Sequence, residues 1–196
     1  LNEFSNSEMI SEAVDKVMSI CKNHSIDPYA MKEHSKKIDL FQNIIPLINE
    51  NASLKEIKFK KWNSVTDGYG YIKKDEDKIE LAVPERYEMC DSSEESNREQ
   101  NFNIAHEIGH LMLHVQNDSL KLNRGPYTEA QSSYAYRATF EIEKEAETFA
   151  YKLLAPKKIL QALTSHLPTI GVSDTDGIHF VIAKALNIPI DKVETA

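Results

Sequence analysis

His106 and His110 stand four residues apart, with Glu107 directly after the first of them. On an α-helix this spacing brings both imidazoles to one face, about one turn apart, where two ring nitrogens can bind one metal ion. Glu107 is rotated by about 100° from His106, so it lies beside the position of a metal-bound water and can take its proton. The His-Glu-x-x-His pattern therefore predicts a zinc site that activates water.

The same five residues could also arise by accident in a chain with seven histidines. The surrounding residues argue against this, because they are apolar on nearly all sides of the helix and predict its burial. Two histidines and a glutamate in a core would be desolvated at a cost unless they bind something. Gly109 costs about 1 kcal/mol relative to alanine inside a helix, which indicates the close approach of another element. The apolar neighbours are Phe102, Ile104, Ala105, Ile108, Leu111, Met112 and Leu113.

A zinc site that keeps one position for water needs a third protein ligand. Residues 140–156 form a second helical pattern that is rich in glutamate, and its apolar positions define one inward face. Glu143 lies about 60° from the centre of that face, Glu145 and Glu147 lie nearer 100°, and Glu141 points away. Glu143 is therefore the best-placed third ligand, with Glu145 as the competing choice. The alternative is that these glutamates form a solvated acidic face, above all Glu141 and Glu145.

Residues 101–114, followed by residues 143–150 and the sequence Leu-Leu-Ala-Pro at 153–156, resemble the ImmA/IrrE-type zinc metallopeptidases. In that family the second motif reads roughly Glu-x-x-Ala-Asn-x-Phe-Ala and ends in Leu-Leu-Met-Pro. The resemblance implies that Glu143 is the third zinc ligand. The chain departs from the pattern at Glu147, where the family has Asn or Asp, and at Ala155, where it has Met.

The expected fold class is α+β, a single zincin-like metallopeptidase domain over residues 1–196 with several helices packed on a small three-stranded antiparallel sheet. Helical periodicity predicts N-terminal helices within 1–50, zinc-site helices within 98–156 and C-terminal helices within 157–196. Alternating apolar residues and short turns predict the sheet within 54–84. The polar residues 91–100 are expected to form a linker.

The polar stretch 117–138 is expected to be a long loop between the two ligand helices. Tyr127, Tyr134 or Tyr136 in this stretch, or a backbone N–H, could donate a hydrogen bond to the oxyanion of the reaction, although a surface role is the simpler expectation for each tyrosine. His114 lies one turn beyond His110 and could extend the row of ligands. A supporting or structural role behind the ligands is the preferred interpretation.

Composition narrows the class of partner. Cys21 and Cys90 are too few and too far apart for a disulfide framework, which favours the cytoplasm. A net charge of −8 disfavours direct nucleic-acid binding, since phosphate binding requires Lys and Arg. The sequence has no apolar run of about 20 residues, so no membrane association is expected. The expected partner is a protein.

We therefore expect a Zn²⁺-dependent endopeptidase with His106, His110 and Glu143 as metal ligands and Glu107 as the general base. The resemblance implies a regulatory peptidase that cuts a helix-turn-helix transcriptional repressor. Two alternatives remain open. One is a zinc-bound protein that binds such a partner without cutting it, as in a toxin–antitoxin pair. The other is a structural zinc domain with a fourth protein ligand.

Overall fold

A computed structural model describes residues 2–23, 56–62, 71–75, 78–84, 92–115 and 133–193, with side chains in the ranges 7–20, 22–23, 92–114 and 140–193. Residues 24–50 of the stretch expected to form N-terminal helices, and residues 117–132 of the expected loop 117–138, lie outside these ranges. The elements are α1 Asn2–Asn23, β1 Glu56–Trp62, β2 Tyr71–Asp75, β3 Lys78–Pro84, α4 Ser93–His110, the π-helical turn η1 Leu111–Val115, α5 Ser133–Leu154, α6 Lys157–His166, the 3-10 turn η2 Leu167–Ile170, α7 Thr175–Leu186 and α8 Ile190–Val193.

The expected fold class is wrong, because the three-stranded antiparallel sheet on which it rests is not found. The strand order is β1-β3-β2, and β1 runs parallel to β3 while β2 runs antiparallel to it. From β1 the chain passes to β2 at the opposite edge of the sheet, and a short connection leads from β2 into the central strand, β3. Alternating apolar residues indicate which face of a strand is buried, but they do not indicate whether its neighbour runs parallel or antiparallel to it. The sequence pattern therefore could not distinguish a mixed sheet from an antiparallel one. All the residues whose side chains are described lie in helices or in the connections between them.

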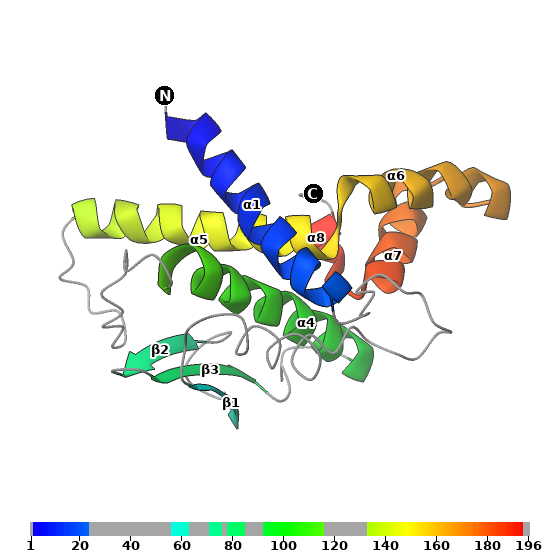
Figure 1. Cartoon of the computed structure of the whole chain (residues 1–196). Helices are drawn as coiled ribbons and strands as arrows, with labels where there is room; N and C mark the ends of the chain where they lie inside the picture. Colours follow the sequence, from blue (N-terminus) through cyan, green and yellow to red (C-terminus); the bar gives the residue numbers. More distant parts are fainter. Residues whose placement is uncertain are drawn as a thin grey trace.

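Helices α4 and α5 form the centre of the molecule (Figure 1), and α4 lies between α5 and the sheet, in contact with β2 and β3. Their shared core is apolar, with Ile108, Leu111 and Phe149 fully buried. Helix α4 starts earlier than expected, because Ser92 caps it: the Ser92 hydroxyl accepts a hydrogen bond from the Glu95 backbone N–H at 3.1 Å. The expected linker at 91–100 is therefore wrong, since nearly all of it is the first half of the metal-motif helix.

Helix α1 packs on α5 and on η1 through an apolar face that includes Val14, Val17 and Ile20. A polar contact also connects the two helices, because Lys152 on α5 donates a hydrogen bond to the hydroxyl of Ser11 on α1 at 2.8 Å. Helix α1 thus packs obliquely across α5 (Figure 1).

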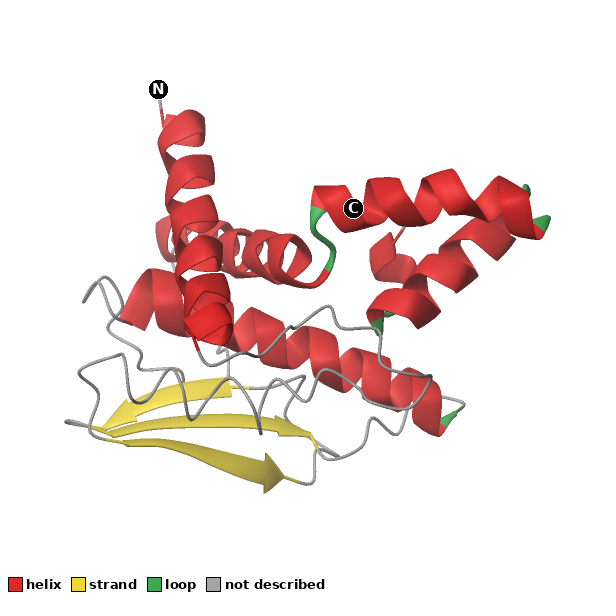
Figure 2. Ribbon diagram, turned by 45° about the vertical axis from the view of Figure 1, so that its right-hand side comes forward, coloured by secondary structure: helices red, strands yellow, loops and turns green. Residues whose placement is uncertain are grey.

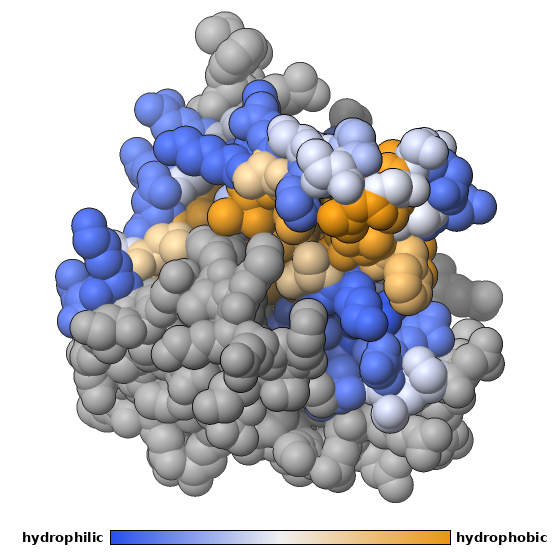
Figure 3. Space-filling model, turned by 90° about the vertical axis from the view of Figure 1, so that its right-hand side faces the viewer, coloured by the Kyte–Doolittle hydropathy of each residue, from blue (hydrophilic) through white to orange (hydrophobic). Residues whose placement is uncertain are grey.

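The C-terminal helices form a unit beside the α4–α5 pair (Figure 2). Asn187 ends α7 in the left-handed conformation at φ 53°, and its carbonyl accepts a hydrogen bond from the Asn101 side chain of α4 at 2.9 Å. Helix α6 has no buried residue, and apolar residues are visible between polar ones on this side of the molecule (Figure 3). None of the helices in the described ranges is long and apolar enough to span a bilayer.

Candidate metal centre

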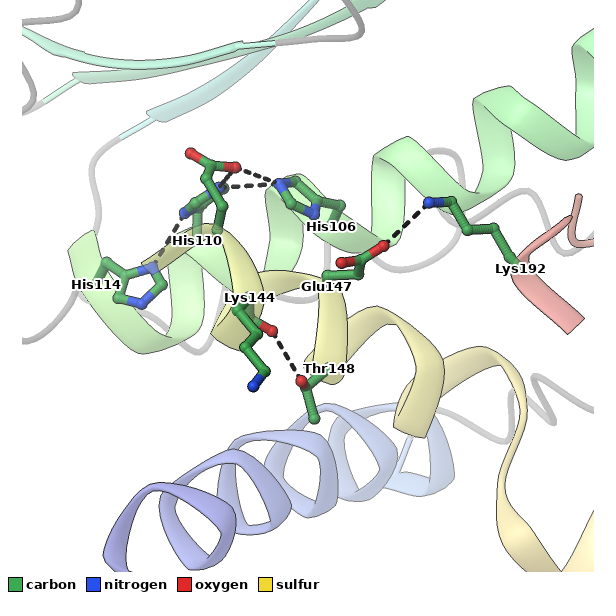
Figure 4. Close-up of polar contacts among 8 residues, drawn as sticks. His106, His110, His114, Lys144, Glu147, Thr148 and Lys192 are labelled. Atoms are coloured by element: carbon green, nitrogen blue, oxygen red, sulfur yellow. Dashed lines mark hydrogen bonds and ion pairs between the residues drawn. The ribbon is translucent and has the colours of Figure 1, made fainter. Parts of the chain in front are cut away.

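Three side chains from two helices converge on one point. His106 and His110 lie one turn apart on α4, and their Nε2 atoms are 3.0 Å from each other. Glu143 comes from α5, and its Oε2 atom lies 3.0 Å from His106 Nε2 and 3.2 Å from His110 Nε2. The three residues form a group that could hold a metal ion. Helix periodicity places the histidines on one face, and the packing of α5 on α4 brings the carboxylate to them (Figure 4).

Hydrogen bonding alone does not account for this triangle. Each ring nitrogen carries at most one proton and an ionised carboxylate oxygen only accepts, so protons can satisfy at most two of its three short edges. One cation in contact with all three atoms satisfies every edge. Zinc bonds of about 2.0–2.1 Å at tetrahedral angles place neighbouring ligand atoms roughly 3.3 Å apart. The observed edges of 3.0–3.2 Å are close to this spacing, so the donor set fits zinc.

Burial keeps His110 in the form that can bind a metal. Its side chain is 2% exposed, and this desolvation is the main reason that its pKa is lowered to about 4, although the hydrogen bond that a charged His110 ring donates to the Glu143 carboxylate opposes the shift. At neutral pH the imidazole is therefore uncharged and has a lone pair available.

Gly109 allows the two helices to come this close. A Cβ atom at this position would lie 3.0 Å from the Ala146 carbonyl oxygen and 3.0 Å from Phe149 Cδ1. Ala146 lies on α5 close to one turn beyond Glu143. The absence of a side chain at residue 109 thus sets the distance between the helix that carries the histidines and the helix that carries the glutamate.

A second layer of polar side chains lies behind His110. His114, in the π-helical turn η1, has its Nδ1 atom 3.0 Å from Nδ1 of His110 (Figure 4). The Nε2 atom of His114 lies 3.0 Å from Oε2 of Glu145. His114 is 4% exposed, and the side chain of Glu145 is 18% exposed. His114 therefore contacts the back of His110, and its ring nitrogens are engaged by His110 and Glu145.

Glu145 is the residue whose place the sequence pattern did not reveal. Its expected position on a solvated acidic face is not what the structure shows, because its carboxylate contacts the buried His114. Two signals together could have found it: its place at the margin of the inward face, and the need of a buried histidine one turn beyond the metal motif for an acceptor.

Glu147, where the resemblance left the side chain's role open, pairs with Lys192 of α8 at 3.0 Å. Burial lowers the pKa of Lys192, but its hydrogen bond and charge interaction with Glu147 outweigh that effect, so the pKa is raised. Lys192 also lies 5.4 Å from the centre of the Phe102 ring. Lys192 therefore links α8 to α5 through Glu147 and to α4 through Phe102.

Glu107 is buried, at 7% exposure, on the helix that carries both histidines. It is not a member of the three-residue group. Of the predicted oxyanion donors, Tyr127 lies outside the described residues, whereas Tyr134 and Tyr136 lie on α5 and not in the loop expected over 117–138. The role of these tyrosines as donors stays a prediction.

Comparison with known proteins bears on this site directly. None of the curated proteins compared with the chain matches it. A family model, Peptidase M78, described as the IrrE N-terminal-like domain, matches residues 64–189. The match covers well over half of the chain and includes both ligand helices, so the resemblance seen in the sequence is confirmed at the level of the family. The chain therefore belongs to the Peptidase M78 family of IrrE N-terminal-like domains.

Proposed function

We propose that this chain is a zinc-dependent endopeptidase that cuts a protein partner. The observation that carries the proposal is the triangle of His106 Nε2, His110 Nε2 and Glu143 Oε2, with edges of 3.0–3.2 Å, in a chain of a peptidase family. The donor set of two imidazoles and one carboxylate is typical of catalytic zinc.

Each residue of the motif has a distinct task in this proposal. His106, His110 and Glu143 hold the metal. A zinc ion held by them would supply Lewis acidity, which makes a water easier to deprotonate and a carbonyl easier to attack. The Glu107 carboxylate accepts the proton of the attacking water and passes it to the nitrogen of the leaving amine.

The number of ligands favours catalysis over a structural role. In the part of the chain with described side chains, the group that could hold a metal has three members. Structural zinc sites are closed by four protein ligands, whereas catalytic sites keep one position for water or substrate.

The proposed substrate is a helix-turn-helix transcriptional repressor, in line with the resemblance to ImmA/IrrE-type peptidases. Strand β2 forms one edge of the described sheet, and α4 contacts it. An extended segment of a partner can add to such an edge through backbone hydrogen bonds alone. This arrangement favours a segment presented by a folded partner over free short peptides.

Mixing the chain with a repressor encoded beside its gene, in the presence of zinc, tests the proposal by the masses of the fragments. The expected result is a cut at one site, with little digestion of casein. Glu107→Gln should keep the zinc and the fold but lose cleavage by several orders of magnitude. Glu141→Gln is the matched control. Because Glu141 is exposed on α5, this substitution should leave cleavage unchanged.

Unchanged cleavage by Glu107→Gln would remove the general-base role. A tight complex that the wild-type chain never cuts would instead favour the non-cleaving regulatory role. Rapid digestion of casein with no repressor fragments would contradict the regulatory substrate while leaving the peptidase chemistry intact.

A further inference from the structure

Behind the metal triangle, His110, His114 and Glu145 form an unbroken polar chain across α4, η1 and α5. The Nδ1 atoms of His110 and His114 are 3.0 Å apart, and His114 Nε2 lies 3.0 Å from Glu145 Oε2. Both histidines are almost fully buried, so their ring nitrogens must find partners within the protein.

The positions of the protons follow from the chemistry of the three groups. An ionised carboxylate accepts only, so the proton between His114 and Glu145 belongs to His114 Nε2. When His114 is neutral, its other ring nitrogen is an acceptor, so His114 Nδ1 accepts. His110 must therefore donate from Nδ1. A neutral His110 with its proton on Nδ1 has its lone pair on Nε2, the atom that faces His106 and Glu143.

We propose that His114 and Glu145 are positioning residues that fix the tautomer and the ring orientation of His110, so that its Nε2 lone pair faces the metal before any metal arrives. This inference rests on the proposed metal site. Outer partners of this kind orient a ligating histidine and increase its basicity, and their loss typically weakens metal binding about 10–100-fold.

The tautomer itself gives a direct test that does not depend on activity. In water the commoner neutral tautomer of histidine carries its proton on Nε2, so the two possibilities differ in a measurable way. Long-range ¹⁵N–¹H correlation spectra of the metal-free, ¹⁵N-labelled chain at neutral pH should show His110 protonated on Nδ1 and unprotonated on Nε2. A spectrum with the proton on His110 Nε2 would overturn the inference, because the lone pair would then face His114.

Zinc affinity in matched variants is the second measurement, made by competition with a chromophoric chelator. Glu145→Ala should weaken zinc binding about 10–100-fold without changing the stoichiometry. Glu145→Gln should restore affinity close to that of the wild type, because its amide oxygen can still accept from His114 Nε2. Glu141→Ala removes the same charge from the same helix and should leave the affinity unchanged.

Equal loss of affinity in Glu145→Gln and Glu145→Ala would contradict the positioning role, since it would assign the effect to charge alone. Unchanged affinity in both would also contradict it. His114→Phe keeps the ring volume and should lose the Nδ1-protonated tautomer of His110; if it does not fold, the wild-type spectrum and the Glu145 pair still decide. A chain that binds no zinc yet shows His110 protonated on Nδ1 would refute the proposed function but not the proton arrangement.

Discussion

Replacing Gly109 by alanine tests whether the close contact of α4 and α5 builds the metal centre. The new Cβ would lie 3.0 Å from the Ala146 carbonyl oxygen and 3.1 Å from Ala146 Cα. These are backbone atoms, so they cannot move aside as the end of a flexible side chain would. Helix α5 must shift away from α4 by a few tenths of an ångström.

Two opposing terms set the expected change in the free energy of unfolding. Alanine is better than glycine inside a helix by about 1 kcal/mol. Overpacking a well-packed contact costs about 1–3 kcal/mol. Together the two terms predict that the free energy of unfolding is unchanged or falls by up to about 2 kcal/mol. Because Ala146 is less than one turn from Glu143, the same shift moves the carboxylate away from the histidines and weakens zinc binding.

Urea denaturation of the metal-free chain measures the first effect, and chelator competition measures the second. Gly177→Ala on α7 is the control, because its Cβ would meet side-chain atoms of Val172 and of Asp174, whose carboxylate caps that helix. It should change stability without changing zinc affinity. A Gly109→Ala chain that is about 1 kcal/mol more stable than wild type and binds zinc equally well would refute the reasoning, because helix propensity would then be the only effect.

Three further predictions follow from the same structure. His106→Ala, His110→Ala and Glu143→Ala should each lose most of about one zinc per chain by elemental analysis, and removal of zinc from the wild type by EDTA should lower the melting temperature reversibly. The metal-free chain should lose stability as the pH falls from about 6.5 towards 4, at up to about 1.4 kcal/mol per pH unit. In this range the unfolded chain takes up a proton on His110, whereas the folded chain, in which the pKa of His110 is lowered to about 4, does not. His110→Gln should reduce this pH dependence of the free energy of unfolding, measured by urea titrations. Lys192→Met should cost about 0.5–1 kcal/mol by removing the partly exposed pair with Glu147, with zinc affinity unchanged; a tenfold loss of affinity would show that this pair supports the site.

The grouping of His106, His110 and Glu143 could be predicted because it depends mainly on helix periodicity. Four residues are close to one turn, and the apolar positions of 140–156 fix which glutamate faces inward. The family could be recognised from the same two segments. Both inferences use local spacing, which a sequence displays directly.

Long-range packing explains what could not be predicted. The direction of β1 relative to β3 depends on how the chain returns to the sheet, and alternation is the same in either case. Residues 91–100 were expected to form a linker because they are polar, yet α4 begins at Ser93, and Ser96 and Arg98 are buried in the fold. Glu145 was expected to be solvated because its partner, His114, is distant in sequence and reaches it only through the packing of two helices.

The π-helical turn η1 has a consequence for how this chain can change in length. A π turn contains one residue more than the α-helical turn it replaces, and such turns are rare and often found at functional sites. Deleting one residue between His110 and His114 would allow a regular α-helix to continue, which is locally the more favourable backbone. The histidine would then stand three residues after His110, nearer along the axis and rotated off its line. Single-residue deletions that strengthen the helix here should therefore be excluded from functional variants, whereas substitutions that keep its length can accumulate.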